Sequence, residues 1–166
     1  MTLTVNTINP LPIRPRSTDP IDSRLIIVAC CERKRPTDRP IPALQLYDDG
    51  CIPALRTRLG HHARLRGRIR ILSARHGLVH ADTPLLPYDQ ALTPAVADQI
   101  RAQVNAALAR DFSATGTPSE ALIIVEPLYL IPLADLLTVG ARIHWIPNYF
   151  TGWPEASAIL DTWSWP

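Results

Sequence analysis

The stretch 69-IRILSARHGLV-79 decides the fold of this chain and marks its functional edge. Residues 69–72 form a β-branched apolar run, and the glycine turn that follows it holds three polar side chains, Ser73, Arg75 and His76. A short gap then leads to 87-PYDQAL-92, which contributes Tyr88 and Asp89. In an open α/β sheet, ligands bind in the crevice beyond the carboxyl ends of the strands. The pattern therefore predicts a buried strand whose tip carries chemistry.

Three further runs resemble this strand, at residues 25–29, 122–125 and 143–146. Each is short and almost wholly apolar, as expected of strands that are buried on both faces of a parallel sheet. Between residues 72 and 122, the apolar residues Val96, Ile100, Val104 and Leu108 recur at helical spacing. Thr93 and Pro94 stand at the N-cap and the first helical position of that helix.

The remaining segments are predicted less regularly. Residues 128–137 are expected to form another helix, with Pro132 in its first turn or at a kink. Several prolines divide residues 35–59 into a loop and one or two short helices. The alternation of strands and helices predicts an α/β fold, a single domain with a small, mainly parallel sheet of about four strands flanked by helices.

Length and composition set the organisation of the chain. Its 166 residues fit one domain, expected over residues 24–166, after a flexible, proline-rich segment over residues 1–23 that is mobile or lies over the surface. No apolar run approaches the roughly 18 residues of a membrane span, so no membrane partner is expected. The amino-terminal segment lacks the apolar stretch of a secretory signal, which favours a cytoplasmic location.

Cysteine and glycine spacing oppose several kinds of site. Cys30 and Cys31 are adjacent and Cys51 is alone, so no disulfide framework is expected. CxxC and HExxH patterns are absent, as are the glycine spacings of dinucleotide and ATP sites. The sequence therefore predicts neither a metal nor a cofactor.

The formal net charge of +2 is small, but the cations are clustered. One cluster runs from residue 56 to residue 75 and the other from residue 33 to residue 39; their members are Arg56, Arg58, Arg64, Arg66, Arg68, Arg70 and Arg75, and Arg33, Lys34, Arg35 and Arg39. Such clusters attract phosphate groups. The alternative is that they reflect only an arginine-favouring codon usage.

Polar residues follow all four predicted strands. They are the segment from Cys30 to Lys34, the turn from Ser73 to Gly77, Glu126 with Tyr129, and Asn148 with Tyr149. Parallel strands place their carboxyl ends on one edge of the sheet. We therefore expect Glu32, Ser73, His76, Asp89 and Glu126 to line one pocket.

These residues resemble a known family. The run 72-LSARHGL-78 followed by 87-PYDQAL-92 is similar to the core motif of the peroxide-stress YaaA family and its shorter relatives, and 29-ACCERK-34 is similar to their opening motif. The resemblance covers about residues 25–137. It implies a link to DNA binding, oxidative damage or modified-base metabolism, and it favours a nucleobase-containing substrate, whether nucleoside, nucleotide or DNA.

N-glycosidic cleavage or base transfer is the reaction that fits these residue types. Positive charge develops on the sugar, and a carboxylate from Asp89 or Glu126 would stabilise it. A protonated His76, or Arg75, would offset the negative charge on the leaving base. The expected substrate-binding residues are Cys31, Glu32, Arg33, Lys34, Ser73, Arg75, Tyr88 and Tyr129, with Tyr88 or Tyr129 stacking on the base.

Other readings stay open at this point. Cys30 or Cys31 beside Arg33 and Lys34 suits a thiolate that performs amidine or acyl transfer on a modified base, with His76 as its base. A Ser73 nucleophile has weaker support, because no nucleophile-elbow pattern surrounds it. A DNA-binding or damage-response module without catalysis would use the arginines and not the carboxylates. The four tryptophans after residue 144 are expected to close the core, with a stacking platform or a homodimer contact as alternatives.

Overall fold

The computed structural model describes residues 11–12 and 14–166, and its centre is a five-stranded sheet in the order β4-β3-β1-β6-β7. The strands are β1 (Arg24–Ala29), β3 (Ile69–Ser73), β4 (Gly77–His80), β6 (Glu120–Ile124) and β7 (Arg142–Ile146). β3 and β6 pair in parallel with β1, and β7 pairs in parallel with β6. The α/β fold with a small, mainly parallel sheet is confirmed, as are the four expected strands.

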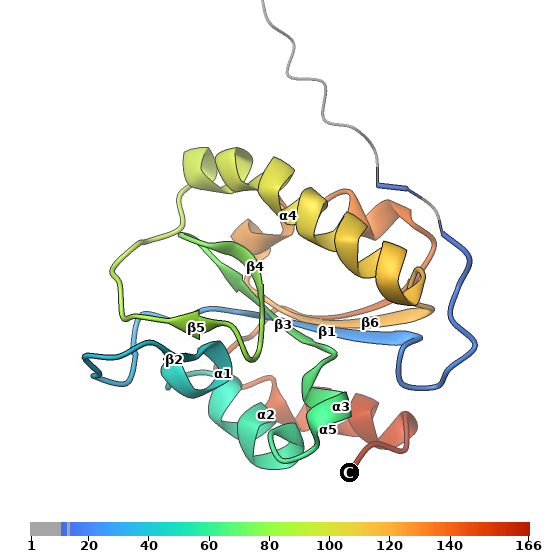
Figure 1. The fold of residues 1–166 in the computed structure, drawn as a ribbon, viewed down its shortest axis with the longest axis horizontal. Helices are drawn as coiled ribbons and strands as arrows, with labels where there is room; N and C mark the ends of the chain where they lie inside the picture. Colours follow the sequence, from blue (N-terminus) through green and yellow to red (C-terminus); the bar gives the residue numbers. More distant parts are fainter. Residues whose placement is uncertain (1–10, 13) are drawn as a thin grey trace, which may run out of the picture.

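Helices cover both faces of this sheet (Figure 1). The long helix α4 (Pro94–Thr115) lies on one face, and the other face is covered by α1 (Ala43–Leu46), α2 (Ile52–Leu59), α3 (Ala63–Arg66) and α5 (Trp153–Thr162). A separate two-stranded sheet joins β2 (Ile41–Pro42) to β5 (Pro84–Leu85). In the described residues, no helix combines the length and the apolar character that crossing a membrane requires.

Burial and capping account for the regular elements. The side chains of residues 25–29 are all buried, because helices cover β1 from both sides. At the start of α4, the Thr93 Oγ1 accepts a hydrogen bond of 3.2 Å from the Val96 backbone N–H, and Pro94 occupies the first turn. The predicted N-cap is therefore confirmed.

The structure corrects the prediction for residues 128–137, which are not one helix. They lie in two 3₁₀ turns, η1 (Pro127–Leu130) and η2 (Leu136–Thr138), joined by further turns around Pro132. The backbone here makes i→i+3 hydrogen bonds, such as the 3.1 Å bond from the Leu133 N–H to the Leu130 carbonyl. Pro132 has no N–H to donate to an α-helical ladder, and this explains the departure.

The short elements β2, β5 and α3 were not predicted, and neither were β4 and α5. β4 pairs antiparallel with β3 through a tight hairpin in which Gly77 has φ +71°, a conformation that favours glycine. α5 brings Trp163 and Trp165 into the core, where the Trp163 Nε1–H donates a 2.8 Å hydrogen bond to Glu120. These two rings close the core as expected, whereas Trp145 is 41% exposed.

Part of the amino-terminal segment can be described. Residues 1–10 and 13, about half of the expected flexible segment, lie outside the described residues. Farther along, the Arg14 backbone N–H donates a 3.1 Å hydrogen bond to Thr117, and Arg16 forms a parallel bridge with the same residue. Residues 14–23 thus lie along the amino-terminal edge of the sheet.

Candidate functional site

The topology of the sheet selects the position of the site. From β1 the chain crosses to β3 on one side, and it then returns to β6 on the other side of β1. The carboxyl ends of β1 and β6 therefore form a switch point, where the two connecting loops diverge and leave a crevice.

A pocket of about 400 Å³ opens at this switch point. Its walls include four carboxylates, supplied by Glu32, Asp49, Asp89 and Glu126. Its aromatic residues are Tyr129, Tyr149 and Phe150, and Cys30, Cys31 and Lys34 also contribute. One acidic pocket with aromatic walls is thus formed where several loops meet: those after β1, β6 and β7 and the one before α4.

The predicted convergence holds for Glu32, Asp89 and Glu126, which all line this pocket, but Ser73 and His76 are not among its lining residues. Cys31, Lys34 and Tyr129 line it as well. The other three expected substrate-binding residues do not line the pocket; they are Arg33, Arg75 and Tyr88.

Ser73 is fully buried and holds the turn after β3. Its Oγ accepts backbone hydrogen bonds from Arg75 at 3.2 Å and from His76 at 3.0 Å, and it lies 2.6 Å from the Tyr88 hydroxyl. A hydroxyl with these partners and no exposure cannot contact a ligand or attack one. The expectation that Ser73 binds substrate is therefore wrong, because packing places it beneath the site.

Tyr88 anchors the loop that carries Asp89. Its hydroxyl lies 2.5 Å from the hydroxyl of Tyr47, which is itself fully buried, as well as 2.6 Å from Ser73. Its ring meets the His76 ring edge-on, with 4.9 Å between the centroids, and the Lys34 ammonium lies 4.4 Å from its centroid. These contacts occupy Tyr88 within the protein, so the structure does not support stacking of this ring on a base.

His76 is a poor candidate for the expected cationic group. Burial and the neighbouring Arg75 guanidinium both lower its pKa, so that the imidazole is neutral at physiological pH. Its backbone carbonyl accepts a 3.0 Å hydrogen bond from the Gln103 side chain on α4. His76 is thus held at the hairpin, outside the pocket.

The structure does not favour Cys31 as the activated thiolate of the alternative reading. Burial raises the pKa of Cys31, and its Sγ lies 3.0 Å from the Arg33 carbonyl as a donor. Cys30 has its Sγ 3.4 Å from the Tyr129 hydroxyl. The Lys34 ammonium donates to the carbonyls of Cys31 at 3.0 Å and of Glu32 at 3.2 Å, so it stabilises the turn instead of a thiolate.

Within residues 11–12 and 14–166, no three His, Cys, Asp or Glu side chains are placed to share a metal ion.

A family model matches residues 25–147, which run from β1 through β7 and contain every lining residue of the pocket except Tyr149 and Phe150. The chain belongs to DUF6884, a family of unknown function. No curated protein and no solved structure matches the chain. Membership of DUF6884 thus brings no activity with it.

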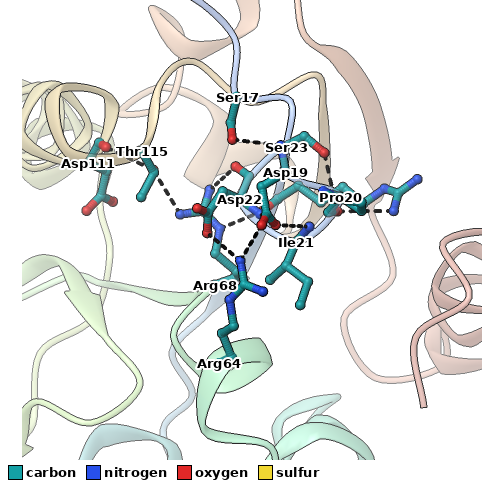
Figure 2. Close-up of polar contacts among 11 residues, drawn as sticks. Ser17, Asp19, Pro20, Ile21, Asp22, Ser23, Arg64, Arg68, Asp111 and Thr115 are labelled. Carbon is teal, nitrogen blue, oxygen red and sulfur yellow. Dashed lines mark hydrogen bonds and ion pairs between the residues drawn. The ribbon is translucent and has the colours of Figure 1, made fainter.

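Most arginines of the cluster 56–70 stabilise the fold. Figure 2 shows Arg64 and Arg68 turned toward the segment around Asp19 and Asp22; Arg64 pairs with Asp19 at 2.6 Å, and Arg68 donates to the Asp22 carbonyl at 3.0 Å. The other four each have a carboxylate partner: Arg56 with Asp48, Arg58 with Asp161, Arg66 with Asp82 and Arg70 with Asp111. These contacts give the arginines of residues 56–70 a role within the fold.

Phe150 and Asp49 are among the lining residues that the sequence reasoning missed. Phe150 is 61% exposed and meets the Tyr149 ring edge-on, with 5.2 Å between the centroids, so it offers a free apolar face at the pocket. Asp49 enters the pocket from a tight turn in which its Oδ1 accepts a 2.8 Å hydrogen bond from the Gly50 N–H. The Asp-Gly pair was a readable turn signal, whereas no sequence pattern marks Phe150.

Proposed function

We propose that this chain binds a nucleobase-containing substrate in the switch-point pocket and cleaves or transfers at its N-glycosidic bond. The observation that carries the proposal is the meeting of carboxylates from separate loops, Glu32, Asp89 and Glu126, around one pocket with aromatic walls. The resemblance of residues 72–78 and 87–92 to the YaaA family motif favours the same substrate class.

The reaction requires negative charge near the sugar. As the bond between the sugar carbon and the base nitrogen breaks, its electron pair leaves with the base and positive charge builds on the sugar ring. Asp89 or Glu126 stabilises that charge, and the other carboxylate accepts a proton from the water or acceptor that attacks the sugar carbon. A pocket with this excess of carboxylates suits such a cationic transition state.

The departing base needs a hydrogen-bond donor and a surface to lie on. Tyr129 takes the first role in place of His76, because burial and the nearby Cys30 raise its pKa and keep the phenol protonated. It lines the pocket, so its hydroxyl can donate to the base nitrogen. Phe150 takes the second role, since its exposed ring is available for stacking.

A binding module without catalysis is the second candidate. It is favoured by the guanidinium groups of Arg33, Arg35, Arg39 and Arg75, which have no carboxylate partner among the described residues. Transfer by a cysteine nucleophile has less support, because the Cys31 thiol has a raised pKa.

The decisive experiment incubates the purified protein with nucleosides, their 5′-monophosphates and DNA with and without modified bases, and measures the free base by chromatography. We expect release of base from at least one substrate. Asp89→Asn or Glu126→Gln should lower kcat by orders of magnitude with little change in KM, because charge is lost but size is kept.

Matched controls are available in exposed carboxylates outside the pocket. Asp98→Asn on α4 and Glu155→Gln on α5 should leave turnover unchanged. If no substrate yields free base, the glycosidic reaction is wrong and the binding role is preferred. If base is released but both pocket variants turn over as fast as these controls, the roles assigned to Asp89 and Glu126 are wrong.

A further inference from the structure

An anion-binding subsite lies beside the acidic pocket, and we propose that it holds the phosphate of a phosphorylated substrate. The subsite is formed by Lys34 and Arg75, which come from the loops after β1 and β3 and both lie against the ring of Tyr88. That the phosphate belongs to a nucleoside rests on the proposed function. That an anion binds here rests on Lys34 and Arg75 alone.

Two like charges share one aromatic ring at this point. The Lys34 ammonium lies 4.4 Å and the Arg75 guanidinium carbon 5.8 Å from the Tyr88 centroid. In the described part of the chain, neither cation has a carboxylate within ion-pair distance. Two cations that lie against one ring and have no carboxylate partner attract an anion from solution.

The backbone around both cations is fixed in advance. The Arg75 N–H is bonded to the buried Ser73 Oγ at 3.2 Å, and Lys34 forms an antiparallel bridge with the buried Tyr47. The Arg75 side chain is nevertheless exposed, and its only hydrogen bond as a donor among the described residues is that of its backbone N–H. Binding an anion here therefore requires little ordering of the backbone.

The contrast with other arginines supports a binding role. Arg56, Arg58, Arg66 and Arg70 each pair with an aspartate, as described above. Arg75 belongs to the same stretch of sequence but has no such partner among the described residues, and it lies at the carboxyl edge of the sheet.

The position of Lys34 connects the subsite to the pocket. Lys34 lines the pocket together with Glu32 and Asp89, so positive and negative regions adjoin. A ligand that fits both regions has an uncharged or cationic part and an anionic part. A nucleoside phosphate has this form, whether it is a free 5′-monophosphate or a residue of a nucleic acid strand.

The test compares binding of nucleosides with binding of their 5′-monophosphates, by calorimetry, at two salt concentrations. For the parent protein we expect at least one monophosphate to bind about 10-fold or more tightly than its nucleoside, with an advantage that falls as salt rises. A short single-stranded oligonucleotide forms a third arm, which distinguishes a strand from a free nucleotide.

Variants at Arg75 make the test specific. Arg75→Ala should remove most of the advantage of the phosphate, Arg75→Lys should keep part of it, and affinity for the nucleoside should not change. Arg142→Ala is the matched control, because Arg142 is exposed and begins β7 at the opposite edge of the sheet. Lys34 is left intact since its ammonium also holds the turn after β1.

The outcomes separate this inference from the proposed function. Equal affinity for nucleosides and monophosphates in the parent, or an Arg75→Ala variant that binds the phosphate as well as Arg142→Ala does, overturns the anion subsite even if base is released. Preferred binding of phosphorylated ligands that depends on Arg75, without any release of base, supports the subsite and rejects the glycosidic reaction.

Discussion

Replacing Tyr88 by phenylalanine tests whether the buried hydroxyl network anchors the loop that carries Asp89. The Tyr88 hydroxyl lies 2.6 Å from the Ser73 Oγ and 2.5 Å from the Tyr47 hydroxyl, and among the described residues it alone bridges those two groups. Removal of this one oxygen therefore breaks both hydrogen bonds while leaving the ring in place.

The cost follows from what each partner retains. Ser73 keeps its two backbone donors, so it loses about 1 kcal/mol of net hydrogen bonding. Tyr47 is fully buried, and Tyr88 is its close hydroxyl partner, with Ser73 only a more distant one, so about 1–3 kcal/mol is added for a poorly satisfied polar group. We expect Tyr88→Phe to lower the free energy of unfolding by about 2–4 kcal/mol.

A double-mutant cycle measured by urea denaturation checks the origin of this cost. Tyr47→Phe alone should cost about 1 kcal/mol, because Tyr88 keeps its bond to Ser73. The double variant lacks the poorly satisfied Tyr47 hydroxyl, so it should be about 1–2 kcal/mol more stable than the sum of the single changes predicts. A cost of Tyr88→Phe below about 0.5 kcal/mol, or strictly additive changes, would refute the network as the anchor.

Two further predictions concern other parts of the fold. Gly50→Ala should lower the free energy of unfolding by about 2–4 kcal/mol, because φ is +63° there and a Cβ would lie 1.8 Å from the Tyr149 ring. The control Gly67→Ala should lower it by less than about 1 kcal/mol, because Gly67 has right-handed helical backbone angles. Equal losses of stability in urea denaturation would contradict this argument. Burial raises the pKa of Glu120, but hydrogen-bond donors on His144 and Trp163 outweigh it, so the pKa is lowered in the folded protein. The carboxylate therefore stabilises the fold at pH values above its ordinary pKa of 4.5, and this contribution is lost as pH falls through the lowered pKa. Unfolding measured against pH should show the deficit of Glu120→Gln shrinking below that pH, and a deficit that does not change with pH counts against a stabilising role for the ionised carboxylate.

The site was predictable in its position but only partly in its members. Parallel strands must place their carboxyl ends on one edge, and Glu32 and Glu126 directly follow strands that the apolar pattern revealed. Asp89 lines the pocket for a different reason, since Tyr88 ties its loop to Tyr47 and Ser73. Nothing local in the sequence announces that tie.

Several polar residues of the motif had the right types for chemistry but are used in the fold. Ser73 satisfies two backbone N–H groups, and His76 is packed against Tyr88 with a lowered pKa. The sequence lists such groups without their partners. Burial and hydrogen bonding decide whether a polar side chain faces a ligand or supports the turn, and both depend on residues far away in the chain.

The sequence by itself determined the strands at residues 25–29, 69–72, 122–125 and 143–146 and the start of α4, because apolar periodicity and helix caps act over neighbouring residues. Only the tertiary structure decided the antiparallel β4, the helix α5 and the aromatic wall at Phe150. These features depend on surfaces that exist only after the sheet has formed. Local sequence encodes which faces become buried, whereas packing across the whole chain selects the groups that remain open to a ligand.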